Sequence, residues 1–219
     1  MNRPAAVVFD CDGVLVDSEP HSVAAWLDVL KTLDHPARER EIAACTGLGF
    51  SPTHDALADI APLPPKDAVW PLLLGALARS FGTGLRIFPD GIGALAACEQ
   101  AGIPVAVASA SPRARLDLTL RAGGLEGRFA VSVSGDDVEH GKPAPDCYLA
   151  AAAGLGVEPT ACVAVEDSGP GAEAAVAAGM HTIAVARDTS DRAALAASGA
   201  KVVELLLPEH VGASLRSAR

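Results

Sequence analysis

The second half of the chain alternates short apolar runs with helix-like segments, and this alternation limits the folds that the chain can adopt. The apolar, strand-like runs lie at 105–108, 129–131, 163–165 and near Ile183 and Val202. The helix-like segments between and after them lie at 114–121, 146–153, 172–178 and 191–197. Parallel strands are joined by long crossover connections, which are usually helices. The pattern therefore predicts an α/β fold, in which a Rossmann-like parallel sheet has helices on both faces.

A first strand is predicted at Ala5–Phe9, but the next strand signal begins only at Ile103. One crossover helix needs far less chain than this. The intervening segments 22–33 and 69–81 carry apolar residues at helical spacing. Prolines 62, 64 and 65 would interrupt a helix between them. The interval is therefore expected to form a small, all-helical cap domain.

The return to the main domain is marked by the turn-forming sequence Phe88-Pro89-Asp90-Gly91. We accordingly place the cap at residues 20–87. The core domain is expected to consist of residues 1–19 and 88–219.

Reactive polar side chains follow several of the predicted strands. Asp10 and Asp12 follow the first strand, Ser109 follows 105–108, and Glu166 with Asp167 follows 163–165. The carboxyl ends of parallel strands share one edge of a sheet, where α/β proteins bind their ligands. Buried acids are costly unless a metal or a reaction uses them. Each segment alone also fits a turn or a helix cap, so the argument depends on their occurring together.

These segments resemble, in order, the four motifs of the haloacid dehalogenase-like (HAD) hydrolase superfamily. The matching residues are Asp10 and Asp12, Ser109, Lys142, and Glu166 with Asp167. The most similar subgroup carries a helical cap after the first motif and includes phosphatases and beta-phosphoglucomutase-like enzymes. The resemblance spans about residues 5–187.

The resemblance implies a catalytic role for several of these residues. Asp10 would attack phosphorus and form an aspartyl-phosphate. Lys142 would bring its positive charge close to this nucleophile and to a phosphoryl oxygen. Ser109 and the backbone amide of Ala110 would bind phosphate oxygens at a helix N-terminus.

The resemblance also implies a Mg²⁺ cofactor, because a carboxylate that attacks a phosphoryl dianion needs converging positive charge. The expected ligands are Asp10, the backbone carbonyl of Asp12 and the side chain of Asp167. Glu166 is expected to bind the metal either directly or through water.

Asp12 indicates the type of reaction. Because it lies two residues beyond Asp10, it is on the same side of an extended chain. Hydrolysis of a phosphate ester needs an acid for the leaving oxygen and then a base for water. The dehalogenase branch of the superfamily lacks this second aspartate, and the phosphonate-cleaving branch also departs here. The resemblance therefore favours small phosphomonoesters, such as sugar or short organic acid phosphates.

Substrate specificity is expected to depend on the cap. Residues 47–51 resemble the cap loop of the family, so Gly47 and Leu48 are predicted to contact substrate. Further candidates for contacts with a second anion or with hydroxyls are Arg38, Arg40, His54, Arg79 and Arg86. Most of these are more typical of solvated surface charges than of substrate contacts.

A hexose-phosphate mutase of the beta-phosphoglucomutase type is the alternative activity. Such mutases carry a histidine four residues before the cap tryptophan, where this chain has Ser22 before Trp26. They also carry an arginine shortly after the cap-loop glycine, and 49–52 contains none. A receiver-like signalling domain also uses Asp, Lys and Mg²⁺, but such domains are shorter and lack the cap insertion and Asp12.

The composition excludes several other classes of protein. The net charge of −10 disfavours binding to nucleic acids or to anionic membranes. No apolar run approaches the roughly 20 residues of a membrane helix. The 5 cysteines are odd in number and widely spaced, which indicates reduced thiols and a cytoplasmic location. The expected partner is a small-molecule phosphate ester.

Overall fold

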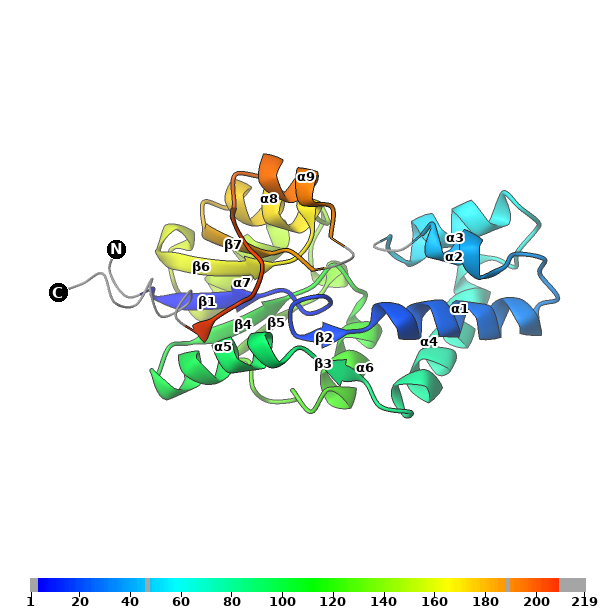
Figure 1. Ribbon diagram of the computed structural model, residues 1–219, viewed down its shortest axis with the longest axis horizontal. Coiled ribbons are helices and arrows are strands. Elements are labelled where there is room, and N and C mark those ends of the chain that lie inside the picture. Colours follow the sequence, from blue (N-terminus) through cyan, green and yellow to red (C-terminus); the bar gives the residue numbers. More distant parts are fainter. Residues whose placement is uncertain (1–3, 46–47, 188–189, 209–219) are drawn as a thin grey trace. The chain divides into compact units, whose positions relative to one another are not determined.

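The computed structural model describes residues 4–45, 48–187 and 190–208 (Figure 1). Two compact units are present, one formed by Met1–Asp17 with Ile87–Arg219 and the other by Ser18–Arg86. We call them the core unit and the cap unit. The cap predicted at 20–87 begins two residues later and ends one residue later than the cap unit.

The core unit contains a six-stranded parallel sheet with the strand order β5-β4-β1-β6-β7-β8. Its strands are β1 (Ala6–Phe9), β4 (Val105–Ala108), β5 (Val131–Val133), β6 (Cys162–Glu166), β7 (His181–Val185) and β8 (Lys201–Val203). The predicted α/β class is therefore confirmed. Two short strands, β2 (Val16–Asp17) and β3 (Arg86–Ile87), form a separate two-stranded sheet.

Helices cover both faces of the large sheet. Every residue of β1, β4 and β6 is buried, which requires cover on both sides of the pleat. The helices of the core unit are α5 (Pro89–Gln100), α6 (Arg113–Ala122), α7 (Asp146–Leu155), α8 (Gly169–Ala177) and α9 (Arg192–Ala197). Two 3₁₀ turns, η1 (Gly135–Asp137) and η2 (Pro159–Ala161), precede α7 and β6.

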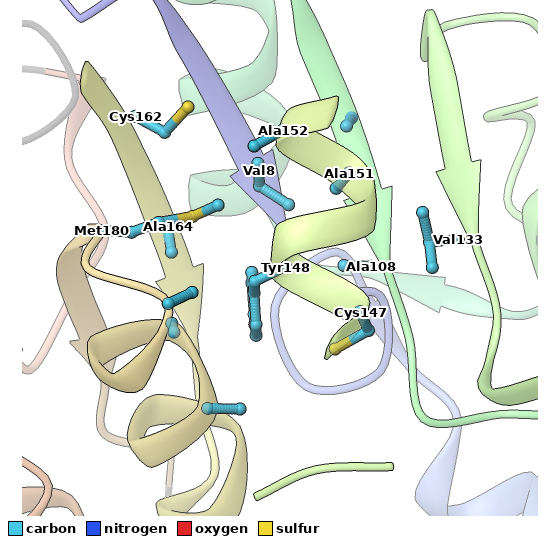
Figure 2. Packing of buried hydrophobic residues seen from close by; sticks show 14 of the residues in the cluster. Val8, Ala108, Val133, Cys147, Tyr148, Ala151, Ala152, Cys162, Ala164 and Met180 are labelled. Atoms are coloured by element: carbon cyan, nitrogen blue, oxygen red, sulfur yellow. The ribbon is translucent and has the colours of Figure 1, made fainter. Parts of the chain in front are cut away.

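Alanine-rich helices pack closely on one face of this sheet. Ala151 and Ala152 of α7 are fully buried in the same apolar cluster as Val8 of β1, and Figure 2 shows α7 crossing the strands there. Ala174 and Ala175 of α8 belong to the same cluster. Because alanine side chains are short, the helix backbones can lie close to the strands. The alanine runs are therefore packed helix faces.

The direction in which successive strands are added to the sheet reverses at β1. After β1, the chain builds β4 and β5 on one side and then returns to add β6, β7 and β8 on the other. Phe9 lies in register with Val107 of β4 and with Val165 of β6. The residues that follow these strands therefore meet at one edge. Such a switch point is where open α/β sheets bind ligands.

The cap unit is helical, with α1 (Glu19–Thr32), α2 (Glu39–Ala43), α3 (Phe50–Ala58) and α4 (Lys66–Phe81). The predicted helices at 22–33 and 69–81 correspond to α1 and α4, whereas α2 and α3 are not evident in the apolar periodicity. Phe50 stacks on Trp26 with 5.9 Å between ring centroids and also contacts Trp70. Among the described residues, no helix combines the length and apolar character of a membrane span.

One strand lies later in the chain than its sequence indicates. The apolar run at 129–131 predicts a strand there, but β5 covers Val131–Val133. The N–H of Ala130 already bonds to the carbonyl of Val105 at 3.0 Å, and pairing with β4 then extends to Val133. Ser132 belongs to β5 because a residue joins a strand through its backbone pairing, and a polar side chain between two valines does not prevent this.

Candidate active site

Asp10 follows β1 at the switch point of the core sheet. Its backbone N–H donates to the carbonyl oxygen of Val165 at 2.9 Å, which continues the pairing of β1 with β6. The carboxylate is 9% exposed, and its Oδ1 lies 2.5 Å from Nζ of Lys142. Hydrogen bonds between charged groups are the stronger ones in proteins. Asp10 is therefore held by the sheet through its backbone and by Lys142 through its side chain.

Lys142 lies just before α7, and oxygen atoms surround its ammonium group. Besides Asp10, Nζ donates to Oε1 of Glu166 at 2.5 Å and to the carbonyl of Ala108 at 3.1 Å. Burial lowers the pKa of Lys142, but the carboxylates of Asp10 and Glu166 outweigh it and hold this pKa well above its usual value. Lys142 is thus a permanent positive charge beside Asp10.

Glu166, the last residue of β6, has hydrogen bonds on both carboxylate oxygens. Oε1 accepts from Lys142 and from the hydroxyl of Tyr148 at 2.9 Å. Oε2 accepts from the N–H groups of Asp167 and Ser168, at 2.9 and 3.0 Å, and from the Ser168 hydroxyl. Burial raises the pKa of Glu166, but Lys142 and these hydrogen bonds bring it below its usual value. Glu166 therefore remains ionised and fixes Lys142.

Asp12 lies in the turn that follows β1. Its Oδ2 accepts a hydrogen bond from the Ser111 hydroxyl at 3.2 Å, and its Oδ1 lies 3.8 Å from Nη2 of Arg115. The side chain is 25% exposed, against 9% for Asp10. Asp12 is therefore the more accessible of the two aspartates. This exposure suits a group that exchanges protons with a substrate or with water.

Ser109 and Ala110 connect β4 to the start of α6. The N–H of Ser109 bonds to the carbonyl of Val133 at 2.9 Å, and its hydroxyl accepts from the N–H of Ser111 at 3.1 Å. Ser109 is buried, whereas Ala110 is exposed. α6 begins at Arg113, and the N–H of Arg113 donates to Oδ2 of Asp136 at 2.8 Å. The binding of phosphate oxygens by Ser109 and by the amide of Ala110 stays a prediction.

Asp10, Glu166 and Asp167 form an acidic cluster. Each contributes an oxygen, and these oxygens all lie within 4.8 Å of one another. Burial raises the pKa of Asp167, and the Glu166 carboxylate adds to this. Burial likewise raises the pKa of Asp10, even though Lys142 opposes it. A divalent cation with a preference for oxygen ligands would relieve this excess of negative charge, so the donor set fits Mg²⁺.

The turn at Gly13 packs directly against Asp167. A Cβ at Gly13 would lie 1.9 Å from Oδ2 of Asp167, so no larger residue fits without moving that carboxylate. Gly13 also has a φ of 81°, in the left-handed region that glycine adopts most easily. Glycine here lets the loop of Asp12 approach the acidic cluster.

A sequence model of the family described as haloacid dehalogenase-like hydrolase matches residues 4–179. The chain belongs to this family. The match includes β1 with its aspartates, Lys142 and the acidic pair that begins at Glu166. The family resemblance predicted from the four motifs is therefore confirmed.

Individual proteins also match most of the chain. Fructose-1-phosphate phosphatase YqaB of Escherichia coli is 35% identical over 189 residues, which cover 84% of this chain and 97% of that protein. Protein SUPPRESSOR OF QUENCHING 1 of Arabidopsis thaliana is 35% identical over 197 residues, 86% of this chain, but the chain spans only 18% of its length. The crystal structure of CbbY from Rhodobacter sphaeroides in complex with phosphate has a TM-score of 0.80 at 26% identity, covering 93% and 95% of the chains.

The core unit brings together Asp10, Lys142 and Glu166 by hydrogen bonds, and places Asp167 beside Asp10 and Glu166. The cap candidates lie in the cap unit. Leu48 is 49% exposed, whereas Gly47 falls outside the described residues. His54 is buried and its Nε2 bonds to the carbonyl of Pro64 at 2.8 Å. The arginines at 38, 40, 79 and 86 are exposed, with Arg40 paired to Glu41 and Arg79 to Asp28.

Other residues of the HAD-like site were not predicted from the sequence. Tyr148 is the only tyrosine of the chain and lies six residues beyond Lys142, but nothing in the apolar pattern of α7 sets it apart. Ser111 lies within the predicted phosphate segment, and Arg115 follows in the first turns of α6. Arg187 lies two residues beyond the end of β7, so the rule that functional residues follow strand ends would have found it.

Proposed function

We propose that this HAD-like hydrolase is a Mg²⁺-dependent phosphatase, which hydrolyses small phosphomonoesters through an aspartyl-phosphate at Asp10. The observation that carries the proposal is the Lys142 ammonium, held 2.5 Å from both Asp10 and Glu166 next to further acids. A buried carboxylate with a fixed cation at one oxygen is suited to nucleophilic attack on a phosphoryl group.

The metal would be held by Asp10, by the backbone carbonyl of Asp12 and by Asp167. Glu166 would take part through water, because both of its oxygens already accept hydrogen bonds within the protein. When bound, Mg²⁺ would neutralise charge on the nucleophile and on the phosphoryl oxygens. It would also favour the ionised forms of Asp10 and Asp167, whose pKa values burial raises.

The residues of the site divide the reaction between them. Ser109 and the amide of Ala110 would hold phosphoryl oxygens while an oxygen of Asp10 attacks phosphorus. As the ester P–O bond breaks, Asp12 would donate its proton to the leaving oxygen. Asp12 would then take a proton from the water that attacks the aspartyl-phosphate. This second step releases inorganic phosphate and restores Asp10.

The substrates are proposed to be sugar phosphates or short organic acid phosphates. The relative named fructose-1-phosphate phosphatase, which the chain matches over nearly its whole length, supports phosphorylated sugars. Gly47 and Leu48 remain the proposed cap contacts to substrate. The exposure of Leu48 is consistent with such a role.

A panel of phosphorylated metabolites tests this function, with released phosphate as the measured product. We expect sugar monophosphates to be hydrolysed in Mg²⁺, and activity to disappear in chelator and return when Mg²⁺ is restored. Equal rates in chelator and in Mg²⁺ would contradict the mechanism. Absence of phosphate release from every ester in the panel would contradict the proposed activity itself.

A hexose-phosphate mutase is the alternative, and contacts within the cap unit argue against it. His21, next to the position where such mutases carry their histidine, bonds through Nδ1 to the Ser80 hydroxyl at 2.8 Å and packs edge-on against Phe81. Phe50, in the segment where they carry an arginine, packs among aromatic rings. We expect ³¹P NMR of a hexose 1-phosphate, Mg²⁺ and bisphosphate primer to show free phosphate. Faster build-up of the 6-phosphate would favour the mutase.

We also propose a cytoplasmic location. All five cysteines are buried free thiols. Unpaired thiols are typical of proteins in reducing compartments.

A further inference from the structure

An arginine that the mechanism does not use lies beside the loop of Asp12. Arg187 follows β7, and its side chain is 12% exposed. Nε donates to the carbonyl of Gly13 at 2.8 Å, and Nη2 donates to the carbonyl of Val14 at 3.3 Å. One guanidinium group thus holds two successive carbonyls of the turn that carries Asp12.

The guanidinium group of Arg187 is itself fixed by other parts of the core unit. Nη1 and Nη2 form a paired contact with the Asp90 carboxylate, at 2.8 and 3.1 Å. Asp90 also accepts the N–H of Leu206 at 3.0 Å. The centroid of the Phe88 ring lies 4.0 Å from the guanidinium carbon of Arg187. A planar guanidinium group that a carboxylate and an aromatic ring already hold loses little conformational freedom when it binds further acceptors.

Bonds on both sides of Gly13, one of them from Arg187, restrict the orientation of the Asp12 carbonyl, one of the proposed metal ligands. The N–H of Gly13 bonds to the carbonyl of Val16 at 2.8 Å, and this N–H and the Asp12 carbonyl belong to one planar peptide. Arg187 holds the next peptide, through the Gly13 carbonyl. Glycine with a φ of 81° would otherwise rotate freely between these peptides.

Ser190, three residues beyond Arg187, contacts the backbone of Asp167. The Ser190 hydroxyl donates to the carbonyl of Asp167 at 2.8 Å, and it accepts the N–H of Arg187 at 3.0 Å. Arg187 and Ser190 therefore connect the loop of Asp12 with the loop of Asp167. Both loops supply proposed metal ligands.

We propose that Arg187, held by Asp90 and assisted by Ser190, is a positioning residue that sets the geometry of the metal site. This inference rests on the proposed function, because it assigns Arg187 to the metal that the phosphatase would use. In this proposal Arg187 acts through the backbone of the Asp12 loop, whose Gly13 and Val14 carbonyls it binds. Residues that orient metal ligands typically change metal affinity about 10- to 100-fold when they are replaced.

The test compares Mg²⁺ binding by the wild type and by Arg187→Met, which keeps much of the side-chain length but removes the donors. Calorimetry without substrate is expected to show affinity about 10- to 100-fold weaker for Arg187→Met. Its kcat/KM at subsaturating Mg²⁺ should fall in parallel, and part of the loss should be recovered at high Mg²⁺. A residue that only stabilised the fold would lower the melting temperature without changing Mg²⁺ affinity.

Arg128→Met is the matched control. Arg128 forms a paired contact with Glu99 in the core unit, at 2.9 and 2.6 Å, and contributes no proposed ligand or substrate contact. Its loss should leave Mg²⁺ affinity unchanged, even where the melting temperature falls. Ser190→Ala is a smaller change and should weaken Mg²⁺ binding a few-fold. This second variant tests the inference even if Arg187→Met does not fold.

The outcomes separate this inference from the proposed function. Wild-type affinity for Mg²⁺ in both folded variants, Arg187→Met and Ser190→Ala, would overturn the positioning role and leave the phosphatase mechanism standing. A wild-type protein that binds no Mg²⁺ would overturn both. Equal weakening in Arg128→Met would also overturn the inference, because the effect would then be one of general stability.

Discussion

At the scale of single residues, one ammonium group organises the site. Lys142 bonds to Asp10 and Glu166, and Tyr148 bonds to the same Glu166 oxygen. Because these groups are buried, removal of one partner leaves the charge or the hydrogen-bonding atom of another unpaired, which costs free energy. Predictions at this scale therefore concern changes that remove one atom or one charge and keep the shape of the side chain.

Asp10→Asn should reduce phosphate release by about 10³-fold or more, because the amide cannot act as the nucleophile. The change is nearly isosteric, so circular dichroism and the melting temperature should show a folded protein. Asp59→Asn, at an exposed position of the cap unit, is the control and should keep wild-type activity. Substantial turnover by pure, folded Asp10→Asn would exclude Asp10 as the nucleophile.

Tyr148→Phe should lower both stability and activity to a moderate degree. The lost hydroxyl donates to ionised Glu166 at 2.9 Å, and bonds of this kind contribute about 1.5–3 kcal/mol. Denaturant unfolding should show a loss of that order, and kcat/KM should fall several-fold as Lys142 becomes less well fixed. Unchanged stability and activity would mean that Lys142 and the backbone donors hold Glu166 without the tyrosine.

At the scale of elements, loops at the carboxyl ends of β1 and β6 meet without space for a side chain. Gly13→Ala should abolish activity, because its Cβ would displace the Asp167 carboxylate. Gly124→Ala is the control: its φ of 65° is also left-handed, but a Cβ there would meet no atom within 4 Å. Both variants should lose about 1–2 kcal/mol of stability from the backbone conformation. Equal activity of the two variants would contradict the close approach of the two loops.

At the scale of the whole molecule, the buried acids link stability to pH and to metal. The pKa values of Asp10 and Asp167 are raised by burial above the value of about 3.9 for the unfolded chain. A raised pKa in the folded state gives stability that is present at low pH and is lost as pH rises through that pKa. In chelator, the melting temperature should therefore decline as the pH rises above about 4, the pKa of an unfolded aspartate, and through the raised pKa values.

Mg²⁺ should offset this decline, because metal binding favours the ionised carboxylates. Melting curves over this pH range, with chelator and with Mg²⁺, measure the effect. Asp167→Asn removes one of the carboxyl groups whose pKa is raised. In chelator, the melting temperature of this variant should fall less than that of the wild type as the pH rises, and Mg²⁺ should raise it little. The same slope and the same Mg²⁺ response in both proteins would contradict the link between the acidic cluster and metal.

Local sequence patterns determined the α/β class and the order of its strands and helices. They also placed Asp10, Ser109 and Glu166 at strand ends, because apolar periodicity and strand boundaries depend on neighbouring residues. The short strands β2 and β3 and the cap helices α2 and α3 were missed, since segments of two to nine residues carry too little periodicity.

Only the tertiary structure decided which distant side chains complete the site. Arg187 lies 174 residues from Gly13 and 97 from Asp90, yet it bonds to both. Tyr148 meets Glu166 because α7 packs on β1 and β4 and β6 is the other neighbour of β1. Gly13 meets Asp167 because β1 and β6 are neighbours. Such contacts depend on strand order and on the space between loops, which are properties of the packed chain and leave no periodic trace in the sequence.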